Sequence, residues 1–255
     1  MISNLQPISQ VDFKPHSIQT RNAADEKISQ VALKGLEGSV LTIYQNVAQI
    51  TDATYVEATM KHHTYSVNNL INAITPKTKI IFIANPNNPT GTILSHTDVE
   101  QLMAGTSPDT LVVLDEAYAE YVNDPTYPKS LELINEYPNL LVTRTFSKIY
   151  GLAALRIGYG IAQPHIIEGL QKVRQPFNVN SLALECAHAA LNNQSFVRES
   201  IHTNNEGKTF LLNELRNIDC TIPNSEGNFL YIEFKDIDGI QLCENLLERG
   251  IIIRS

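Results

Sequence analysis

The sequence predicts an α/β protein in which helices cover a mainly parallel sheet, followed by a small α+β unit. Four short apolar runs lack polar alternation and are bounded by loop residues; they cover residues 79–84, 111–114, 140–142 and 157–162. Such runs are typical of strands that are buried on both faces, as in a parallel sheet under helices. The character of the chain changes near Asn192 and Asn193, and after them we expect a strand, a helix and a second strand.

The first part of the chain carries weaker patterns. Residues 1–20 are polar and aperiodic, so we expect a poorly ordered arm. Residues 25–33 fit a short helix, and residues 40–44 look like a strand. Residues 66–74 have helical spacing, and Ser66 suits the N-cap of that helix.

The remaining elements complete the expected order. Further helices are predicted at residues 96–105, 164–174, 180–192 and 195–217. The last part is predicted to form a strand at 228–234, a helix at 239–249 and a strand at 251–253. We therefore divide the chain into an arm (1–20), a large domain (21–192) and a small C-terminal domain (193–255).

Composition excludes several classes of function. The 255 residues are 43% hydrophobic, which is enough to bury a core and argues against disorder. The net charge is −8, so we expect no partner among nucleic acids or anionic membranes. No apolar run is long enough to span a membrane, and the first residues do not resemble a signal peptide. Three cysteines without CxxC spacing indicate buried thiols in a reducing, cytoplasmic compartment.

Unusual residues gather where the predicted strands end. The first run is followed by NPNNPTGT (85–92), the second by DEAY (115–118), and the third by TFSK (145–148). Ligands of open α/β sheets bind outside the carboxyl ends of the strands. The three loops are therefore predicted to form one site. The pair His62 and His63 is expected to be a polar loop without a metal, because no third ligand has suitable spacing.

These segments, in this order, resemble the fold-type I pyridoxal-phosphate (PLP) aminotransferases, and more narrowly the histidinol-phosphate aminotransferases. The resemblance is carried by IANPNNPTGT, LDEAYAEY, TRTFSKIYGLAALRIGYGIA, RQPFNVN, NFLYIEF and RGIIIRS, and it covers residues 64–255. It implies a three-layer large domain of the PLP-transferase type and a small, incomplete C-terminal domain.

The resemblance assigns catalytic roles to four residues. PLP acts as an electron sink for the carbanion left when the substrate loses its Cα proton. Lys148 would form the resting Schiff base with it, and would then move the proton between Cα and C4′. Asp115 would face the pyridine nitrogen and keep it protonated. Asn88 and Tyr118 would donate hydrogen bonds to the 3′ oxygen of the cofactor.

Further residues are implied at the phosphate and at the substrate. Thr145, Ser147 and Arg156 match the phosphate-binding positions of the family, where the planar fork of an arginine suits phosphate. Arg254 matches an arginine that reads the anionic substrate. Asn88 is expected to contact the substrate as well.

The sequence departs from the family pattern at both ends. Ala23 and Ala24 are the expected match for a helix N-terminus whose backbone N–H groups cup the phosphate, with Ala23 in place of a glycine. Tyr44 is either the ring that stacks on the cofactor or a neighbouring core tyrosine. The N-terminal arm motif, a second substrate-binding arginine and the last helix are not found, so the chain looks shortened at both ends.

The resemblance implies a PLP-dependent aminotransferase of histidine biosynthesis. It would exchange the amino group of L-histidinol phosphate with 2-oxoglutarate, as a cytoplasmic homodimer with a small-molecule amino donor and a 2-oxo acid as its partners. One alternative is a related PLP aminotransferase or decarboxylase of another amino acid. The other alternative is a degenerate or truncated homologue without catalysis.

Overall fold

A computed structural model describes residues 29–33 and 40–254 of the chain, and it contains a mixed, mainly parallel sheet of six strands in the order β2-β1-β3-β4-β5-β6. The strands are β1 (Ser29–Leu33), β2 (Thr54–Ala58), β3 (Thr78–Ala84), β4 (Leu111–Asp115), β5 (Leu140–Thr145) and β6 (Gly158–Ala162). Strands β1 to β5 run parallel, and β6 pairs with β5 antiparallel. The predicted α/β class with a mainly parallel sheet is therefore confirmed.

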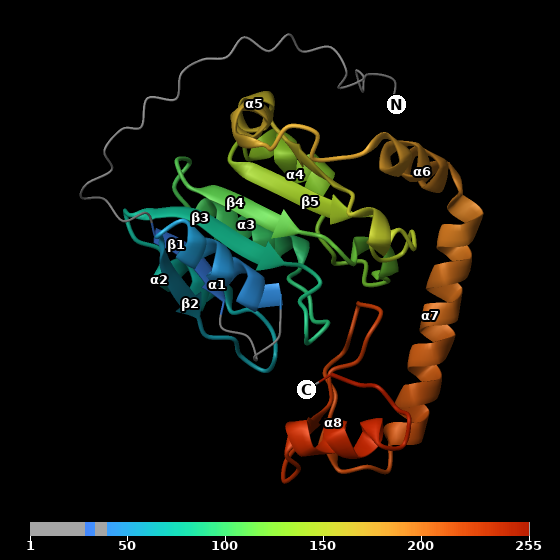
Figure 1. Ribbon diagram of the computed structural model, residues 1–255. Coiled ribbons are helices and arrows are strands. Elements are labelled where there is room, and N and C mark those ends of the chain that lie inside the picture. Colours follow the sequence, from blue (N-terminus) through green and yellow to red (C-terminus); the bar gives the residue numbers. More distant parts are fainter. Residues whose placement is uncertain (1–28, 34–39, 255) are drawn as a thin grey trace.

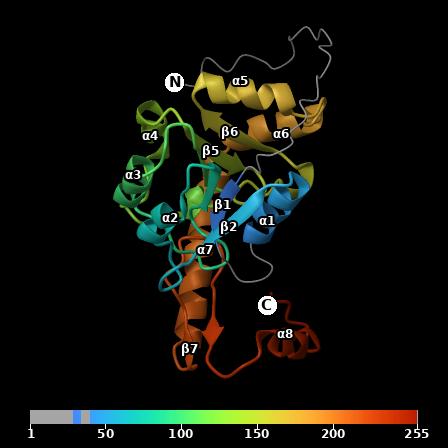
Figure 2. The same ribbon diagram turned by 90° about the vertical axis from the view of Figure 1, so that its left-hand side faces the viewer.

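Helices cover the two faces of this sheet and make three layers. They are α1 (Val40–Ile50), α2 (Val67–Ala73), α3 (His96–Ala104), α4 (Ser130–Glu136), α5 (Pro164–Val173), α6 (Ser181–Asn192), α7 (Gln194–Leu215) and α8 (Gly239–Leu247). Figure 2 shows α2, α3 and α4 on one face of the sheet and α1 on the other. The loops that follow the central strands leave the sheet at the carboxyl ends of these strands.

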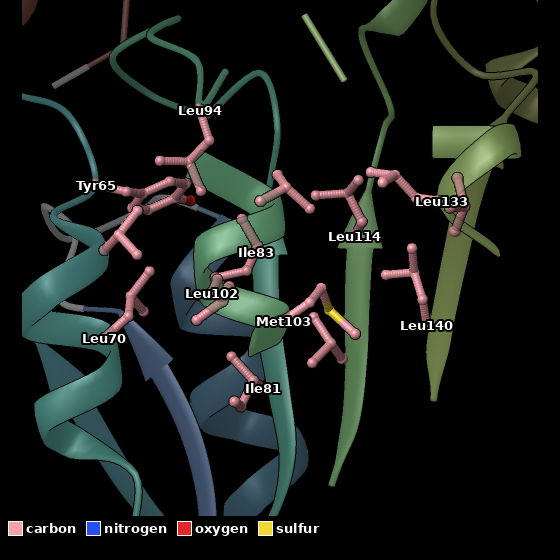
Figure 3. Close-up of a cluster of buried hydrophobic side chains, with 14 of the residues drawn as sticks. Tyr65, Leu70, Ile81, Ile83, Leu94, Leu102, Met103, Leu114, Leu133 and Leu140 are labelled. Carbon is pink, nitrogen blue, oxygen red and sulfur yellow. The ribbon is translucent and has the colours of Figure 1, made fainter. Parts of the chain in front are cut away.

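The main core lies between the sheet and the layer of α2, α3 and α4 (Figure 3). Strand residues alternate between faces, so Ile81 and Ile83 of β3 point into this layer together with Leu114 of β4. Leu102 of α3 and Leu133 of α4 meet them from the helices, and all five side chains are buried. Burying an aliphatic side chain of this size contributes about 1.5–3 kcal/mol to the free energy of folding, so these contacts stabilise the packing of the helices on the sheet.

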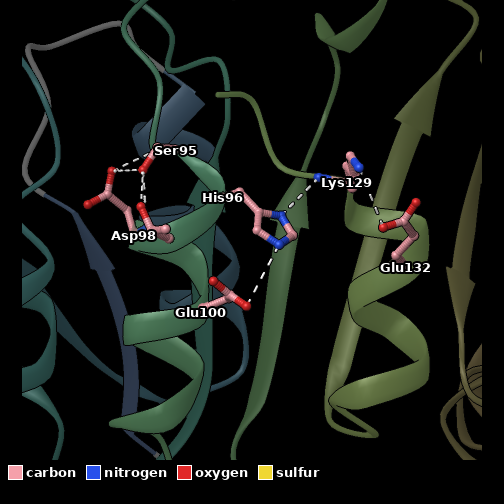
Figure 4. A network of polar contacts seen from close by, with 7 residues as sticks. Ser95, His96, Asp98, Glu100, Lys129 and Glu132 are labelled. Atoms are coloured by element: carbon pink, nitrogen blue, oxygen red, sulfur yellow. Dashed lines mark hydrogen bonds and ion pairs between the residues drawn. The ribbon is translucent and has the colours of Figure 1, made fainter. Parts of the chain in front are cut away.

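Helix α3 begins with a capping box. The Ser95 hydroxyl accepts from the backbone N–H of Asp98, and an Asp98 carboxylate oxygen accepts from the backbone N–H of Ser95. The next residue, His96, accepts a hydrogen bond at Nδ1 from the backbone of Lys129, and its Nε2 lies 3.7 Å from Glu100 (Figure 4). The start of α3 is thereby joined to the residue that precedes α4.

Most predicted helices are confirmed with bounds that shift by one or two residues. The Ser66 side chain accepts from the backbone N–H of Asn69, so the expected N-cap of α2 is present. The helices predicted from residues 96, 164, 180 and 195 onward correspond to α3, α5, α6 and α7.

Four sequence expectations about local structure are wrong. Residues 40–44 lie in helix α1, where Tyr44 and Ala48 are buried one turn apart against the sheet. Residues 29–33 are the described part of the helix expected at 25–33. They form the parallel strand β1, because β2 and β3 pair with it on both sides.

The expected strand at 228–234 is limited to two residues, and residues 251–253 form no strand. A strand needs a hydrogen-bonding neighbour, and the described part of the chain supplies none for residues 228–232 or 251–253.

The C-terminal part extends from the long helix α7 (Figure 1). A two-stranded antiparallel sheet of β7 (Cys220–Thr221) and β8 (Glu233–Phe234) follows, and then helix α8. The division at residue 193 stays a prediction, and the expected arm at 1–20 lies outside the described residues.

Within the described residues, none of the helices has the length and apolar character needed to cross a membrane.

Candidate functional site

The carboxyl ends of β3, β4 and β5 bring the three sequence motifs together. Ala84 pairs with Asp115 across β3 and β4, and Asp115 pairs with Thr143 across β4 and β5. The backbone N–H of Asn85 donates to the Asp115 carbonyl at 2.9 Å, which ties the first loop to the start of the second. The loops that the sequence predicts to form one site therefore begin at adjacent points on one edge of the sheet.

The loop at 85–92 is braced by its own polar side chains. The Asn85 amide bonds to the backbone of Leu94 in both directions, at 2.8 and 3.1 Å. The Asn87 amide accepts from the Tyr65 hydroxyl at 2.6 Å and donates to the Thr90 hydroxyl at 2.8 Å. Because Asn85 and Asn87 are buried and hydrogen-bonded, the loop holds the residue that follows them, Asn88, in a defined position.

Asn88, Tyr118 and Lys148 lie together. The Asn88 side-chain N–H donates to the Tyr118 hydroxyl at 3.1 Å. The Lys148 Nζ lies 5.1 Å from the centre of the Tyr118 ring, which is within cation–π range. Phe229, from the C-terminal part, packs its ring edge-on against the same tyrosine at 5.0 Å. Three residues that the resemblance assigned to one reaction centre are therefore neighbours in space.

Asp115 is a partly buried carboxylate at the end of β4. Burial raises its pKa above the usual value, whereas hydrogen bonds from Tyr44, Thr143 and the Ala117 backbone, together with the charge of Lys148, lower the pKa. The Tyr44 hydroxyl donates to Asp115 Oδ2 at 2.8 Å. The arrangement presents a desolvated acceptor that is held by several donors.

The expected phosphate-binding residues also converge. The backbone N–H of Ser147 donates to Thr145 Oγ1 at 3.0 Å. Arg156 Nη1 donates to Ser147 Oγ at 3.4 Å and to the Ala153 carbonyl at 2.8 Å. One guanidinium and two hydroxyl groups are therefore linked in the segment that carries Lys148, and this donor set suits a phosphate.

The other predicted site residues do not join this group in the same way. Tyr44 stacks on Phe82, with ring centroids 4.6 Å apart and planes 13° apart. Arg254 is exposed at the end of the described chain, in a segment without regular structure. Ala23 and Ala24 lie outside the described residues.

Sequence reasoning missed a C-terminal segment that docks on the first loop. The backbone N–H of Glu226 donates to the Gly91 carbonyl at 2.8 Å, and a Glu226 carboxylate oxygen accepts from the Asn123 backbone at 2.8 Å. A Cβ at Gly91 would lie 2.1 Å from Ser225 Oγ, so only glycine permits this approach. The sequence shows a glycine at position 91, but it shows neither the positive φ of Gly91 nor the distant segment that packs against it.

Sequence reasoning also missed a buried ion pair behind the site. Glu116 is fully buried, and its Oε2 accepts from Arg144 Nε at 2.9 Å and from Arg144 Nη2 at 2.8 Å. Burial raises the pKa of Glu116, and the Arg144 charge opposes that shift. The register of β4 on β5 places Asp115 beside Thr143, so the residues that follow them, Glu116 and Arg144, lie beside each other on the opposite face. This pair could therefore have been inferred from the alternation of side chains along paired strands.

Of the pair His62 and His63, His63 contacts the C-terminal part of the chain. Thr92 donates to the His63 carbonyl at 2.7 Å, His63 Nε2 lies 3.2 Å from Glu233, and its ring lies 5.5 Å from that of Tyr231. Among the described residues, no group of three or more His, Cys, Asp or Glu residues could hold a metal ion.

Comparison with known proteins identifies the family. The sequence profile of class I and II aminotransferases matches residues 42–255. The chain belongs to this aminotransferase family. It is 40% identical over 250 residues to a histidinol-phosphate aminotransferase of Brevibacillus brevis, covering 95% of this chain and 68% of that protein. It is 42% identical over 212 residues to histidinol-phosphate aminotransferase 1 of Nitrosococcus oceani, covering 83% of this chain and 57% of that protein.

Solved aminotransferase structures have the same fold. The crystal structure of histidinol-phosphate aminotransferase from Sinorhizobium meliloti, in complex with pyridoxal-5′-phosphate, matches with a TM-score of 0.81 at 27% identity. The match covers 91% of this chain and 63% of that one. An aspartate aminotransferase of Thermus thermophilus matches with a TM-score of 0.77 at 21% identity, which supports the fold alone. This aminotransferase-family chain thus spans 57–68% of the length of the four proteins named here.

Proposed function

We propose that this aminotransferase-family chain binds PLP through Lys148 and transaminates L-histidinol phosphate with 2-oxoglutarate. The observation that carries the proposal is the meeting of Lys148, Tyr118 and Asn88 beside Asp115 at the carboxyl ends of β3 to β5. The 40% identity to a histidinol-phosphate aminotransferase favours that substrate over those of other family members.

The residues present suit the cofactor. Asp115 offers a partly buried carboxylate for the ring nitrogen, and Asn88 with Tyr118 offers two polar groups for the 3′ oxygen. Thr145, Ser147 and Arg156 could hold the phosphate, since their polar atoms already lie within hydrogen-bond distance of one another. The ring nitrogen and the phosphate would therefore each meet a group of opposite charge, and the 3′ oxygen would meet two polar groups.

The chemistry divides between the cofactor and the chain. When bound, PLP takes up the electron pair left behind when the substrate Cα loses its proton. Lys148 would bind the cofactor carbonyl and, once displaced by the substrate amine, would hold the proton taken from Cα. Asp115 would keep the ring nitrogen protonated, and Asn88 and Tyr118 would orient the ring. Arg254 is the proposed contact for the anionic end of the substrate.

Half-transamination tests this proposal. Protein loaded with PLP is mixed with L-histidinol phosphate, without a 2-oxo acid, and the absorbance of the lysine-linked cofactor is followed. We expect conversion to the pyridoxamine form and release of the keto phosphate, and 2-oxoglutarate should restore the starting spectrum. Lys148→Ala should show no conversion. Conversion by glutamate but not by L-histidinol phosphate would refute the substrate assignment. L-histidinol phosphate has no carboxyl group, so a decarboxylase would instead be indicated by release of CO2 from an added amino acid.

A second candidate function is binding of PLP without turnover. It is favoured by the exposure of Arg254, the proposed substrate contact, in a segment without regular structure. A stable lysine-linked cofactor that no amino donor converts would favour this candidate.

We further propose a cytoplasmic homodimer, and analytical ultracentrifugation of the purified chain would test the dimer.

A further inference from the structure

We propose that Tyr44 is a positioning residue for Asp115, and that it acts on the cofactor site through this carboxylate rather than by stacking on the cofactor ring. This inference rests on the proposed binding of PLP. It concerns the choice that the sequence left open for Tyr44, between a stacking ring and a core tyrosine.

Helix α1 and the sheet place Tyr44 beside Asp115. Tyr44 is 7% exposed, and its ring lies flat on Phe82 of β3. Phe82 pairs with Val113 and Ala84 pairs with Asp115, so Phe82 and Asp115 point to the same face of the sheet. The face of Tyr44 that stacks on Phe82 is used for packing, and its hydroxyl reaches Asp115 Oδ2 at 2.8 Å.

The hydrogen-bond acceptors of Asp115 indicate the role of the Tyr44 hydroxyl. An ionised carboxylate has about four lone-pair sites. Tyr44 donates to Asp115 Oδ2 at 2.8 Å, and donors at the Thr143 side chain and the Ala117 backbone also lower the pKa of Asp115. These donors orient the carboxylate and still leave acceptor capacity for the N–H of a protonated ring nitrogen.

Tyr44 stays a donor in this position. Burial raises the pKa of Tyr44, and the charge of Asp115 raises it further, so the phenol keeps its proton at physiological pH. A hydrogen bond to a charged group stabilises that charge more than a neutral pair does. Loss of the hydroxyl would leave the ionised form of Asp115 less stable and less well oriented, and this weakens its hold on a protonated ring nitrogen.

Two substitutions at Tyr44 separate the two roles. Tyr44→Phe keeps the ring on Phe82 and removes only the donor, whereas Tyr44→Leu removes both. If Tyr44 positions Asp115, both variants bind PLP about tenfold more weakly, which is the effect of one charge-assisted hydrogen bond. The absorbance band of the lysine-linked cofactor should also move toward that of Asp115→Asn. Tyr55→Phe, whose hydroxyl bonds to Glu57, is the control and should bind like the unsubstituted chain.

The opposite pattern would overturn the inference. If Tyr44→Phe binds PLP as tightly as the unsubstituted chain while Tyr44→Leu binds about tenfold more weakly, the ring itself is what matters. The contact is also testable without cofactor, by a double-mutant cycle of Tyr44→Phe and Asp115→Asn on the unfolding equilibrium. We expect a coupling of about threefold to tenfold in the equilibrium constant, and additive effects would refute the positioning role.

The same experiments keep the two proposals apart. If the unsubstituted chain shows no lysine-linked band with PLP, the proposed function fails. The double-mutant cycle would still decide whether Tyr44 and Asp115 interact.

Discussion

Gly91 offers a sharp test of how the C-terminal segment joins the cofactor loop. Its φ of +75° lies in the left-handed region, where a residue with a Cβ costs about 1–2 kcal/mol. An added Cβ would also lie 2.5 Å from Ser225 Cβ and 2.8 Å from Ser225 Cα, so the backbone of the docked segment must move. Gly91→Ala therefore strains its own loop and displaces the segment.

The expected loss follows from these contacts. Displacement removes the hydrogen bond from Glu226 to the Gly91 carbonyl and weakens the one from Asn123 to Glu226. Each such bond contributes about 1 kcal/mol net. Together with the backbone strain, Gly91→Ala should lower the free energy of unfolding by about 2–4 kcal/mol. Urea denaturation followed by circular dichroism measures this quantity.

Two further variants make the test specific. Gly207→Ala, inside helix α7 with no atom near the added Cβ, should raise the free energy of unfolding by about 0.5–1 kcal/mol. Ser225→Gly removes the two side-chain atoms nearest the added Cβ, so Gly91→Ala should cost less in that background than in the unsubstituted chain. If Gly91→Ala proves as harmless as Gly207→Ala, the docking of the segment on this loop is refuted.

Three other predictions concern the buried ion pair, the core and Asp115. Arg144→Met leaves the buried Glu116 without its ion-pair partner and should lower the free energy of unfolding by about 3–5 kcal/mol in urea denaturation; a loss below about 1 kcal/mol would contradict the burial of the pair. Leu140→Ala creates a cavity in the core and should cost about 2–5 kcal/mol in the same assay, whereas Leu131→Ala, which is half exposed, should stay within about 0.5 kcal/mol. Burial raises the pKa of Asp115, so stability from its protonated form is present below about pH 3.8 and is lost as the pH rises through the folded-state pKa. Urea titrations at several pH values should therefore show Asp115→Asn gaining stability relative to the unsubstituted chain as the pH rises, and a pH-independent difference would contradict the raised pKa.

The central strands could be predicted from the sequence because they are buried on both faces. Residues 80–84 and 111–114 are apolar without alternation, and this pattern is typical of a parallel strand that is covered on both faces. The motifs at the strand ends then followed, since parallel strands present their carboxyl ends at one edge. The positions of Asn88, Asp115 and Lys148 after three predicted strands, together with the family resemblance, were enough to predict that they meet.

The first elements were predicted wrongly because local preference and tertiary pairing disagree there. Residues 40–44 contain β-branched and aromatic residues that favour a strand, yet Tyr44 and Ala48 gain more by burying one helical face against the sheet. Residues 29–33 pair with two strands that are distant in sequence. No local pattern reports such a neighbour.

The contacts that complete the site were also out of reach of sequence reasoning. The hydrogen bond between Tyr44 and Asp115 joins residues 71 positions apart, and that between Asn123 and Glu226 joins residues 103 apart. Both depend on how helix α1 and the C-terminal segment pack, which composition and spacing do not encode. Pairs such as Glu116 with Arg144 are accessible in principle, once the register of β4 on β5 is known.

Borohydride trapping tests the assignment of the cofactor site most directly. The chain is incubated with PLP, reduced with sodium borohydride, digested, and searched by mass spectrometry for the lysine that carries the pyridoxyl group. We predict that the label lies on Lys148 and that Asp115→Asn lowers the labelled fraction at limiting PLP. Lys208, which donates to the Ser225 carbonyl at 2.7 Å, should stay unlabelled. Label spread over several lysines, or absent from Lys148, would contradict a PLP site at the carboxyl ends of β3, β4 and β5.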